Sequence, residues 1–194
     1  MNYKPILFST PMVQAILHEK KTQTRRVIKP QPTNPRYNCI GWLGWEDGHG
    51  YKIQPQPHSV GDILWVRETW ADGCMSGYIY KAGHEYADRL DDLKQWRPSI
   101  FMPKEACRIF LRVTDVRVER VRDISEADAT SEGVKNYHDS KGNITTKNKV
   151  EAFRHLWDYL NEKRGFGWDT NPWVWVYTFE RVEKPTDWLN SEGE

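Results

Sequence analysis

The stretch that decides the fold is Lys20-Lys21-Thr22-Gln23-Thr24-Arg25-Arg26-Val27-Ile28-Lys29, which packs five cations and two hydroxyls into ten residues. No acidic residue lies between Glu19 and Glu46. A lysine and a threonine three positions apart, followed two positions later by an arginine, can supply a base, a nucleophile and an anion clamp. The same ten residues can also form a solvated basic loop. The flanking sequence has to decide between these two interpretations.

The residues on either side place this basic stretch at the exit of a short helix. Thr10 is a favourable N-cap, Pro11 suits the first turn, and apolar residues recur at helical spacing, which predicts a helix over residues 11–19. Pro30 and Pro32 end any regular structure that starts at the arginines. The chain therefore changes direction here, where side chains can converge on a pocket.

The composition excludes several classes of protein. A length of 194 residues is enough for one domain with a real core, and ten tryptophans and nine tyrosines carry much of its burial. A net charge of +1 is too low for a protein that coats long nucleic acids, so any contact with nucleic acid is expected to be local. We found no segment of membrane-spanning length and no signal peptide, and therefore expect no membrane partner.

The three cysteines are Cys39, Cys74 and Cys107, and they lie far apart in the sequence. They form no C-x-x-C pair, and the six histidines have no metal-type spacing with them or with each other. Three cysteines, an odd number, also cannot all be paired with one another in disulfides. We therefore expect reduced thiols in a cytoplasmic protein, with no metal and no cofactor. The oligomeric state is not predicted.

The pattern of apolar residues predicts about six strands and three short helices. The expected strands cover residues 6–9, 61–70, 78–81, 99–102, 107–121 and 172–182. The second and third helices are expected to start at the caps Ser125 and Asn148, the latter helix ending near Lys163. In the longest strand the apolar phase slips by one position, which predicts a bulge near Thr114 and Asp115.

This order of elements does not have the regular alternation of a Rossmann or TIM unit. It predicts an α+β fold, a small and mostly antiparallel β-barrel decorated with about three short helices. One domain is expected over residues 1–185, with long loop insertions at about 30–59 and 73–104, and a flexible tail over residues 186–194.

Three motifs in fixed order carry a resemblance to a known family. They are residues 21–26 after a helix, residues 61–67 opening a strand, and residues 131–133 ending a helix. Together they resemble the ASCH domain family, whose fold is a β-barrel related to the PUA domains that bind RNA. The match runs from about residue 6 to residue 182, although Glu19 replaces the usual glycine of the first motif. Two further segments, residues 29–32 and 171–176, look like those of the longer forms carried by phages and prophages.

One branch of that family removes the acetyl group from N(4)-acetylcytidine. By position, its functional residues fall here on Lys21, Thr24 and Glu132, which the resemblance implies are catalytic. Those enzymes are shorter, so long loops covering the barrel mouth would change the substrate or close the site. Five further residues are assigned to substrate binding: Thr22, Arg26, Trp65, Arg67 and Glu68.

Amide hydrolysis needs a nucleophile, a base and a group that stabilises the oxyanion. Thr24 can attack if Lys21 removes its proton, which requires a lysine pKa well below its ordinary value. In a second assignment Glu132 is the base and Lys21 stabilises the oxyanion. The sequence leaves both open.

Each of these residues also has a purely structural interpretation. Lys21 can be a surface cation, Thr24 a turn hydroxyl, and Glu132 a counter-charge to the basic stretch. Arg26 can clamp a carbonyl or phosphate, or pair with Glu68. Trp65 can stack on a base or simply belong to the core, as strand aromatics more often do.

The sequence therefore favours a protein that binds a nucleobase, a modified nucleoside or single-stranded RNA in a basic cleft. The resemblance implies hydrolysis of an exocyclic amide such as that of N(4)-acetylcytidine. A non-catalytic RNA-binding module and a ribonuclease are the alternatives.

Overall fold

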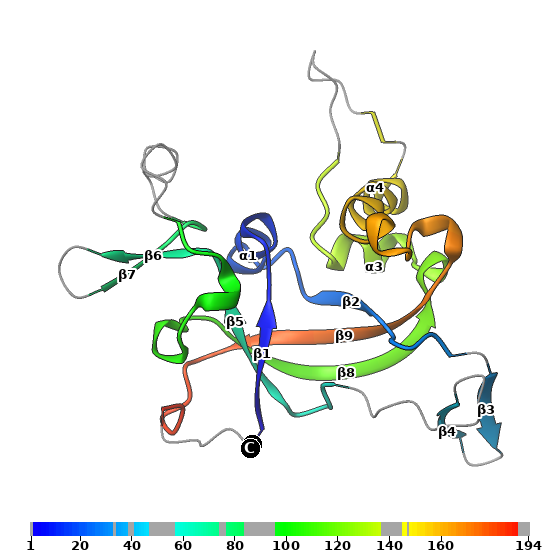
Figure 1. Ribbon diagram of the computed structural model, residues 1–194, viewed down its shortest axis with the longest axis horizontal. Helices are drawn as coiled ribbons and strands as arrows, with labels where there is room; N and C mark the ends of the chain where they lie inside the picture. Colours follow the sequence, from blue (N-terminus) through cyan, green and yellow to red (C-terminus); the bar gives the residue numbers. More distant parts are fainter. Residues whose placement is uncertain are drawn as a thin grey trace. The chain divides into compact units, whose positions relative to one another are not determined.

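The computed structural model describes residues 2–32, 34–38, 41–46, 57–73, 77–83, 96–136, 145–146 and 148–189 (Figure 1). Five strands are hydrogen-bonded in the order β1-β5-β8-β9-β2, and two separate hairpins pair β3 with β4 and β6 with β7. The α+β class predicted from the sequence is confirmed. No strand pairing among the described residues closes this order into a barrel.

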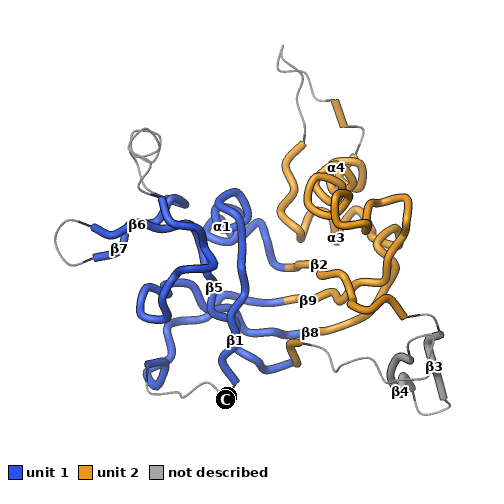
Figure 2. Tube along the Cα trace, viewed as in Figure 1, with its two compact units in different colours: residues 1–22, 60–114, 179–194 blue, residues 23–59, 115–178 orange. Residues whose placement is uncertain are grey.

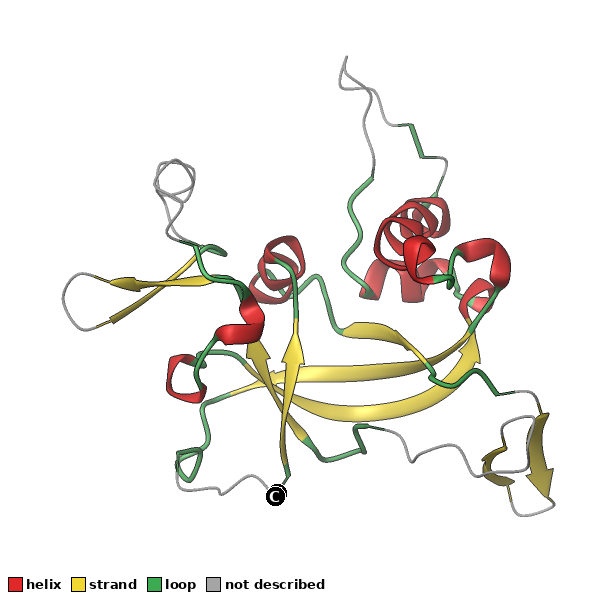
Figure 3. Cartoon of the chain, viewed as in Figure 1, coloured by secondary structure: helices red, strands yellow, loops and turns green. Residues whose placement is uncertain are grey.

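Figure 3 colours the described helices, strands and loops separately. The α-helices are α1 (Thr10–Leu17), α3 (Glu126–Ser131) and α4 (Lys149–Asn161). The strands are β1 (Tyr3–Leu7), β2 (Gln23–Val27), β3 (Asn34–Asn38), β4 (Gly41–Glu46), β5 (Ile63–Arg67), β6 (Trp70–Gly73), β7 (Gly77–Tyr80), β8 (Phe110–Arg120) and β9 (Trp173–Val182). Five short 3-10 helices complete the list: η1 (Ser99–Phe101), η2 (Lys104–Ala106), η3 (Val121–Asp123), η4 (Glu162–Arg164) and η5 (Trp168–Thr170).

The chain forms two compact units, which Figure 2 colours separately. Unit 1 contains Met1–Thr22, Val60–Thr114 and Phe179–Glu194, and unit 2 contains Gln23–Ser59 and Asp115–Thr178. Strands β8 and β9 contribute residues to both units. The single domain expected over residues 1–185 stays a prediction, and each unit is described by itself below.

Unit 1 is built on β5, which pairs in parallel with β1 and antiparallel with β8. The burial of Ile63, Leu64 and Val66 shows that the start of this strand is covered on both faces, as its apolar run predicts. Ile63 belongs to a buried cluster that also contains Trp70, Met102, Ala106, Cys107, Phe110 and Trp188.

The C-terminal segment closes this core instead of fraying at residue 186. Trp188 is fully buried, its ring centroid lies 5.0 Å from that of Phe110 and 5.5 Å from that of Trp65, and its indole N–H donates to the Lys104 carbonyl at 3.3 Å. The flexible tail expected over residues 186–194 is therefore wrong for residues 186–189. A single tryptophan gives little periodic signal, yet it buries enough area to hold a chain end.

Unit 2 pairs β2 antiparallel with the first half of β9, from Gln23 opposite Thr178 to Val27 opposite Val174. Helices α3 and α4 pack together and share a core with β9, in which Ala129, Phe153 and Trp157 are buried. Both helices have the caps that the sequence predicts. Ser125 accepts a hydrogen bond from the backbone N–H of Asp128, and Asn148 accepts one from that of Glu151.

Two parts of the sequence prediction need correction. Residues 99–101 form the 3-10 helix η1 and not a strand, and the flanking Pro98 and Pro103 have no N–H group to donate to a ladder. Strand β2 lies in the basic stretch, where no strand was predicted. The insertion expected at about 30–59 stays a prediction, and the β3–β4 hairpin lies within it. The bulge near Thr114 stays a prediction.

The turn after α1 explains how the basic stretch begins. Glu19 has a φ of 58°, a left-handed conformation that glycine adopts without strain. The N–H groups of Lys20 and Lys21 both donate to the carbonyl of Ala15, at 2.8 and 3.1 Å, which caps the helix end. The glycine of the ASCH-type motif is thus replaced by Glu19 at a position whose backbone favours glycine.

Candidate functional site

The candidate site in unit 2 starts from strand β2. Successive side chains of a strand point to opposite faces, so Thr24 and Arg26 share one face while Gln23 and Arg25 share the other. Thr24 is paired in register with Tyr177 of β9, and Arg26 with Trp175. Thr24 is only 2% exposed, which is unusual for a hydroxyl in a polar segment.

Arg25 is the centre of a buried ionic network, and its side chain is 1% exposed. Its Nε and Nη2 atoms donate to Oε1 of Glu119 at 2.8 and 2.6 Å. Its Nη1 atom donates to Oε1 of Gln23 at 2.7 Å and to Oε1 of Glu132 at 3.1 Å. A buried charge is expensive unless its hydrogen bonds are satisfied, and this fork is filled by three acceptor side chains.

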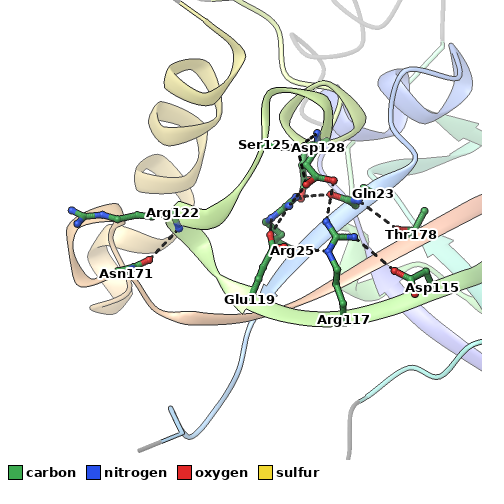
Figure 4. Close-up of polar contacts among 11 residues, drawn as sticks. Gln23, Arg25, Asp115, Arg117, Glu119, Arg122, Ser125, Asp128, Asn171 and Thr178 are labelled. Atoms are coloured by element: carbon green, nitrogen blue, oxygen red, sulfur yellow. Dashed lines mark hydrogen bonds and ion pairs between the residues drawn. The ribbon is translucent and has the colours of Figure 1, made fainter. Parts of the chain in front are cut away.

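A second arginine extends the network along β8 (Figure 4). Arg117 donates to Oε2 of Glu119 at 3.1 Å and to Oδ1 of Asp128 at 3.0 Å, and it lies 3.7 Å from Asp115. Burial alone would raise the pKa of Asp128, but hydrogen bonds from Gln23, Ser125 and Arg117 outweigh it and lower that pKa. Asp128 therefore ties the start of α3 to strand β8.

Glu132 interacts with two arginines of β2. It is the C-cap residue of α3, where its backbone N–H donates to the Asp128 carbonyl at 2.8 Å, and it is 5% exposed. Its carboxylate accepts from Arg25 and also interacts electrostatically with Arg26. Burial lowers the pKa of the Arg26 guanidinium, while the charges of Glu132 and Tyr177 act in the opposite direction. A carboxylate held in one orientation by a guanidinium is suited to accept or donate a proton at a fixed place.

The predicted residues Thr24, Arg26 and Glu132 all belong to unit 2, where the charge of Glu132 acts on the Arg26 guanidinium. Lys21 and Thr22 belong to unit 1. Lys21 is 2% exposed, and its ammonium lies 5.7 Å from the centroid of the Phe8 ring. Lys21 is thus not the surface cation of the structural interpretation, whereas Thr22 is exposed and its carbonyl accepts from Phe179.

The other predicted binding residues of unit 1 have structural partners. Glu68 is 1% exposed and accepts two hydrogen bonds from Arg108, both at 2.9 Å, although burial still raises its pKa. Arg67 donates to the carbonyl of Ile100, and its guanidinium lies 5.3 Å from the ring centroid of Trp65. The ion-pair partner of Glu68 is therefore Arg108, and not the Arg26 of the structural interpretation.

Sequence reasoning missed the partners that hold Arg25. It assigned Arg25 to neither catalysis nor substrate binding, and named neither Gln23 nor Glu119 as a partner for it. One signal was available: Asp115, Arg117 and Glu119 alternate with valines, which places three alternating charges on one face of a strand. Such a face needs opposite charges from a neighbouring segment when it is covered.

Among the described residues, no group of three or more histidine, cysteine, aspartate or glutamate side chains is suited to a metal ion. No helix in the described part of the chain is long and apolar enough to cross a membrane.

Comparisons with known proteins add two similar structures. No family model and no curated protein matches the sequence. Protein EF3133 from Enterococcus faecalis V583, of family DUF984, is 11% identical and aligns over 96% of this chain and 84% of its own, with a TM-score of 0.48. An ASCH domain from Lactobacillus crispatus JV V101 is 14% identical and aligns over 94% of this chain and 81% of its own, with a TM-score of 0.44.

Proposed function

We propose that this protein binds a nucleobase, carried by a modified nucleoside or by RNA, at a site that contains Thr24, Arg26 and Glu132. We further propose that it hydrolyses an exocyclic amide of that base. The observation that supports this most is the burial of the Glu132 carboxylate, which accepts a hydrogen bond from Arg25 and interacts electrostatically with Arg26. Buried ionisable groups with charged partners are concentrated at functional sites, because their desolvation costs stability.

These residues suit a nucleobase because its edge carries hydrogen-bond donors and acceptors in one plane. A carboxylate such as that of Glu132 can accept from an exocyclic N–H, and a guanidinium such as that of Arg26 can donate to a ring carbonyl. Pockets that hold a base read this edge in the same way. Arg25 contributes indirectly, because it fixes the orientation of Glu132.

The proposed reaction consumes one water and releases an amine and a carboxylate. The Thr24 hydroxyl adds to the acyl carbon while Glu132 takes its proton, and the carbon–nitrogen bond then breaks as Glu132 returns that proton to the leaving amine. Water cleaves the resulting ester of Thr24. Arg26 stabilises the negative oxygen in both steps. Lys21 lies three residues before Thr24 in the sequence motif, and its importance for turnover is tested by substitution.

The test is incubation of the purified protein with N(4)-acetylcytidine, measuring cytidine and acetate together. Both products should appear in equal amounts. Glu132→Gln should lower kcat by about 10²–10⁴-fold, the usual range for loss of a general acid–base group. Thr24→Val removes the nucleophile while keeping the side-chain shape, and should abolish turnover.

Two lysines provide a matched control. Lys21→Ala removes a buried lysine and Lys20→Ala an exposed one next to it in the sequence. Turnover should depend on Lys21 far more than on Lys20. If the folded wild-type protein neither binds nor converts the nucleoside, the proposal is wrong; if it binds without turnover, only the hydrolysis is wrong.

A further inference from the structure

Tyr177 of β9 is a polar side chain beside Thr24 to which the proposed reaction assigns no role. Strands β2 and β9 are antiparallel neighbours, and Tyr177 lies directly opposite Thr24 in their register. Directly opposite residues of an antiparallel pair point to the same face, with their Cβ atoms about 4.5–5.5 Å apart. The side chain of Tyr177 therefore starts next to the proposed nucleophile and on the same face of the sheet.

Tyr177 carries a hydroxyl into the interior of unit 2. Its exposed fraction is 0% and that of Thr24 is 2%, so neither side chain belongs to the surface. Burial of a hydroxyl costs free energy that burial of a purely apolar ring does not. Two positions further along the same strand, Phe179 is buried as a ring without a hydroxyl. An aromatic residue of β9 thus needs no hydroxyl to be packed.

Two neighbours define the surroundings of this phenol. The ring of His58 meets the Tyr177 ring edge-on, with centroids 5.0 Å apart and an angle of 71° between the planes. Such edge-to-face contacts favour one orientation of the ring. Tyr177 also acts electrostatically on the guanidinium of Arg26, as Glu132 does. The phenol is therefore close to the cation that the proposed reaction places at the acyl oxygen.

A phenol in this position suits the charge that forms during amide hydrolysis. The acyl oxygen becomes negative when a nucleophile adds to the acyl carbon, and hydrogen-bond donors held ready at that oxygen lower the barrier. Tyrosine hydroxyls are among the side chains that serve as such donors. The acyl oxygen and the attacking oxygen are bound to the same carbon in the intermediate, so a donor beside Thr24 can reach the acyl oxygen.

We propose that Tyr177 donates a hydrogen bond to the acyl oxygen of the substrate while Thr24 adds to the acyl carbon. Together with Arg26 it forms an oxyanion site, and this inference rests on the proposed function. No bond to Tyr177 forms or breaks, and its proton stays on the phenol oxygen. His58 is a positioning residue, because it acts through the Tyr177 ring. A hydrogen bond that strengthens in the transition state raises kcat more than it lowers KM.

The test compares Tyr177→Phe with the wild type in the turnover of N(4)-acetylcytidine. The substitution removes only the hydroxyl, so kcat should fall about 10²–10³-fold, the range for loss of one oxyanion donor, with little change in KM. Tyr159→Phe is the matched control, because Tyr159 lies on α4 of the same unit and is 83% exposed. It should turn over the substrate as the wild type does. Circular dichroism checks that each variant is folded.

The analogue N(4)-thioacetylcytidine distinguishes a hydrogen bond to the acyl oxygen from a merely structural effect. Sulfur accepts hydrogen bonds weakly, so the analogue gains little from the hydroxyl. The ratio of kcat for the oxygen substrate to kcat for the sulfur substrate should therefore be roughly tenfold larger in the wild type than in Tyr177→Phe. The different intrinsic reactivities of the two substrates cancel in this comparison.

Substitutions of His58 give a second test that leaves the Tyr177 hydroxyl in place. His58→Phe keeps an aromatic ring against Tyr177 and His58→Ala removes it. The oxygen-to-sulfur ratio should be lower in His58→Ala than in His58→Phe, since a loosely held phenol donates less well.

The outcomes separate this inference from the proposed function. If the wild type converts the nucleoside and the oxygen-to-sulfur ratio is the same in all variants, Tyr177 has only a structural role; the inference is then wrong and the hydrolysis stands. Equal kcat values in Tyr177→Phe and Tyr159→Phe would also overturn the inference alone. No conversion by the folded wild type would overturn the hydrolysis and this inference together.

Discussion

Removal of the Arg25 guanidinium is the sharpest structural test of unit 2. Its side chain is 1% exposed and holds Glu119, Gln23 and Glu132 through hydrogen bonds of 2.6 to 3.1 Å. Arg25→Met keeps the length of the side chain but leaves buried carboxylates without their partner. Breaking a buried pair in this way costs about 3–5 kcal/mol.

The assay is urea unfolding followed by far-ultraviolet circular dichroism, with hydrogen exchange of α3 and β9 as a local readout. Folded domains have total stabilities of about 5–15 kcal/mol, so Arg25→Met should lose a large fraction of the stability of the protein. Hydrogen exchange should increase first in α3. Arg25→Lys keeps the positive charge but lacks the planar guanidinium. Its free energy of unfolding should therefore lie between those of the wild type and Arg25→Met.

Arg112→Met is the control for a solvent-exposed pair. Arg112 and Glu180 lie 3.3 Å apart and are both about half exposed, so their loss should cost no more than about 1 kcal/mol. If Arg25→Met were as stable as Arg112→Met, the ionic network would not hold unit 2 together, and our account of how Glu132 is positioned would be wrong.

Three more predictions follow from the structure. Trp188→Ala should destabilise the protein by about 3–5 kcal/mol in the same urea assay, whereas Leu189→Ala at an exposed position should be nearly neutral; equal effects would contradict the packed chain end. Burial raises the pKa of Cys107 to about 11, so iodoacetamide at about pH 8 should modify it only in urea, as mass spectrometry of its peptide would show. Because the pKa of Asp128 is lowered in the fold, its stabilising contribution is present above its unfolded pKa and is lost as the pH falls through the folded value. Asp128→Asn should therefore lower Tm near neutral pH and lessen the further fall of Tm on acidification; parallel curves would refute this.

The sequence predicted the elements whose signals are local. The helix caps Ser125 and Asn148 and the alternating strand that begins at Trp173 all lie within a few residues of the structure they specify. Strand β2 was not predicted, because its sequence is also typical of a solvated basic loop. The Arg25 guanidinium can be buried because Glu119 and Glu132, from distant segments, form ion pairs with it.

The roles assigned to the candidate site residues stay predictions. The motif identified Thr24, Arg26 and Glu132 as residues to examine, and burial sets them apart from an ordinary basic loop. The sequence could not show that Arg25 fixes Glu132, nor that Glu68 pairs with Arg108, because both pairs depend on which strands come together. Pairing of this kind is decided by tertiary packing and not by local propensity.

The measurement that tests the central claim most directly is the affinity of the protein for N(4)-acetylcytidine, determined by isothermal titration for the wild type, Glu132→Gln and Glu180→Gln. Glu180 is exposed, so its variant controls for the loss of one negative charge. We predict that Glu132→Gln weakens binding by roughly ten- to a hundredfold, the effect of losing a hydrogen bond to a charged group, while Glu180→Gln binds as the wild type does. Equal affinities in all three proteins, or no binding by the wild type, would contradict the account.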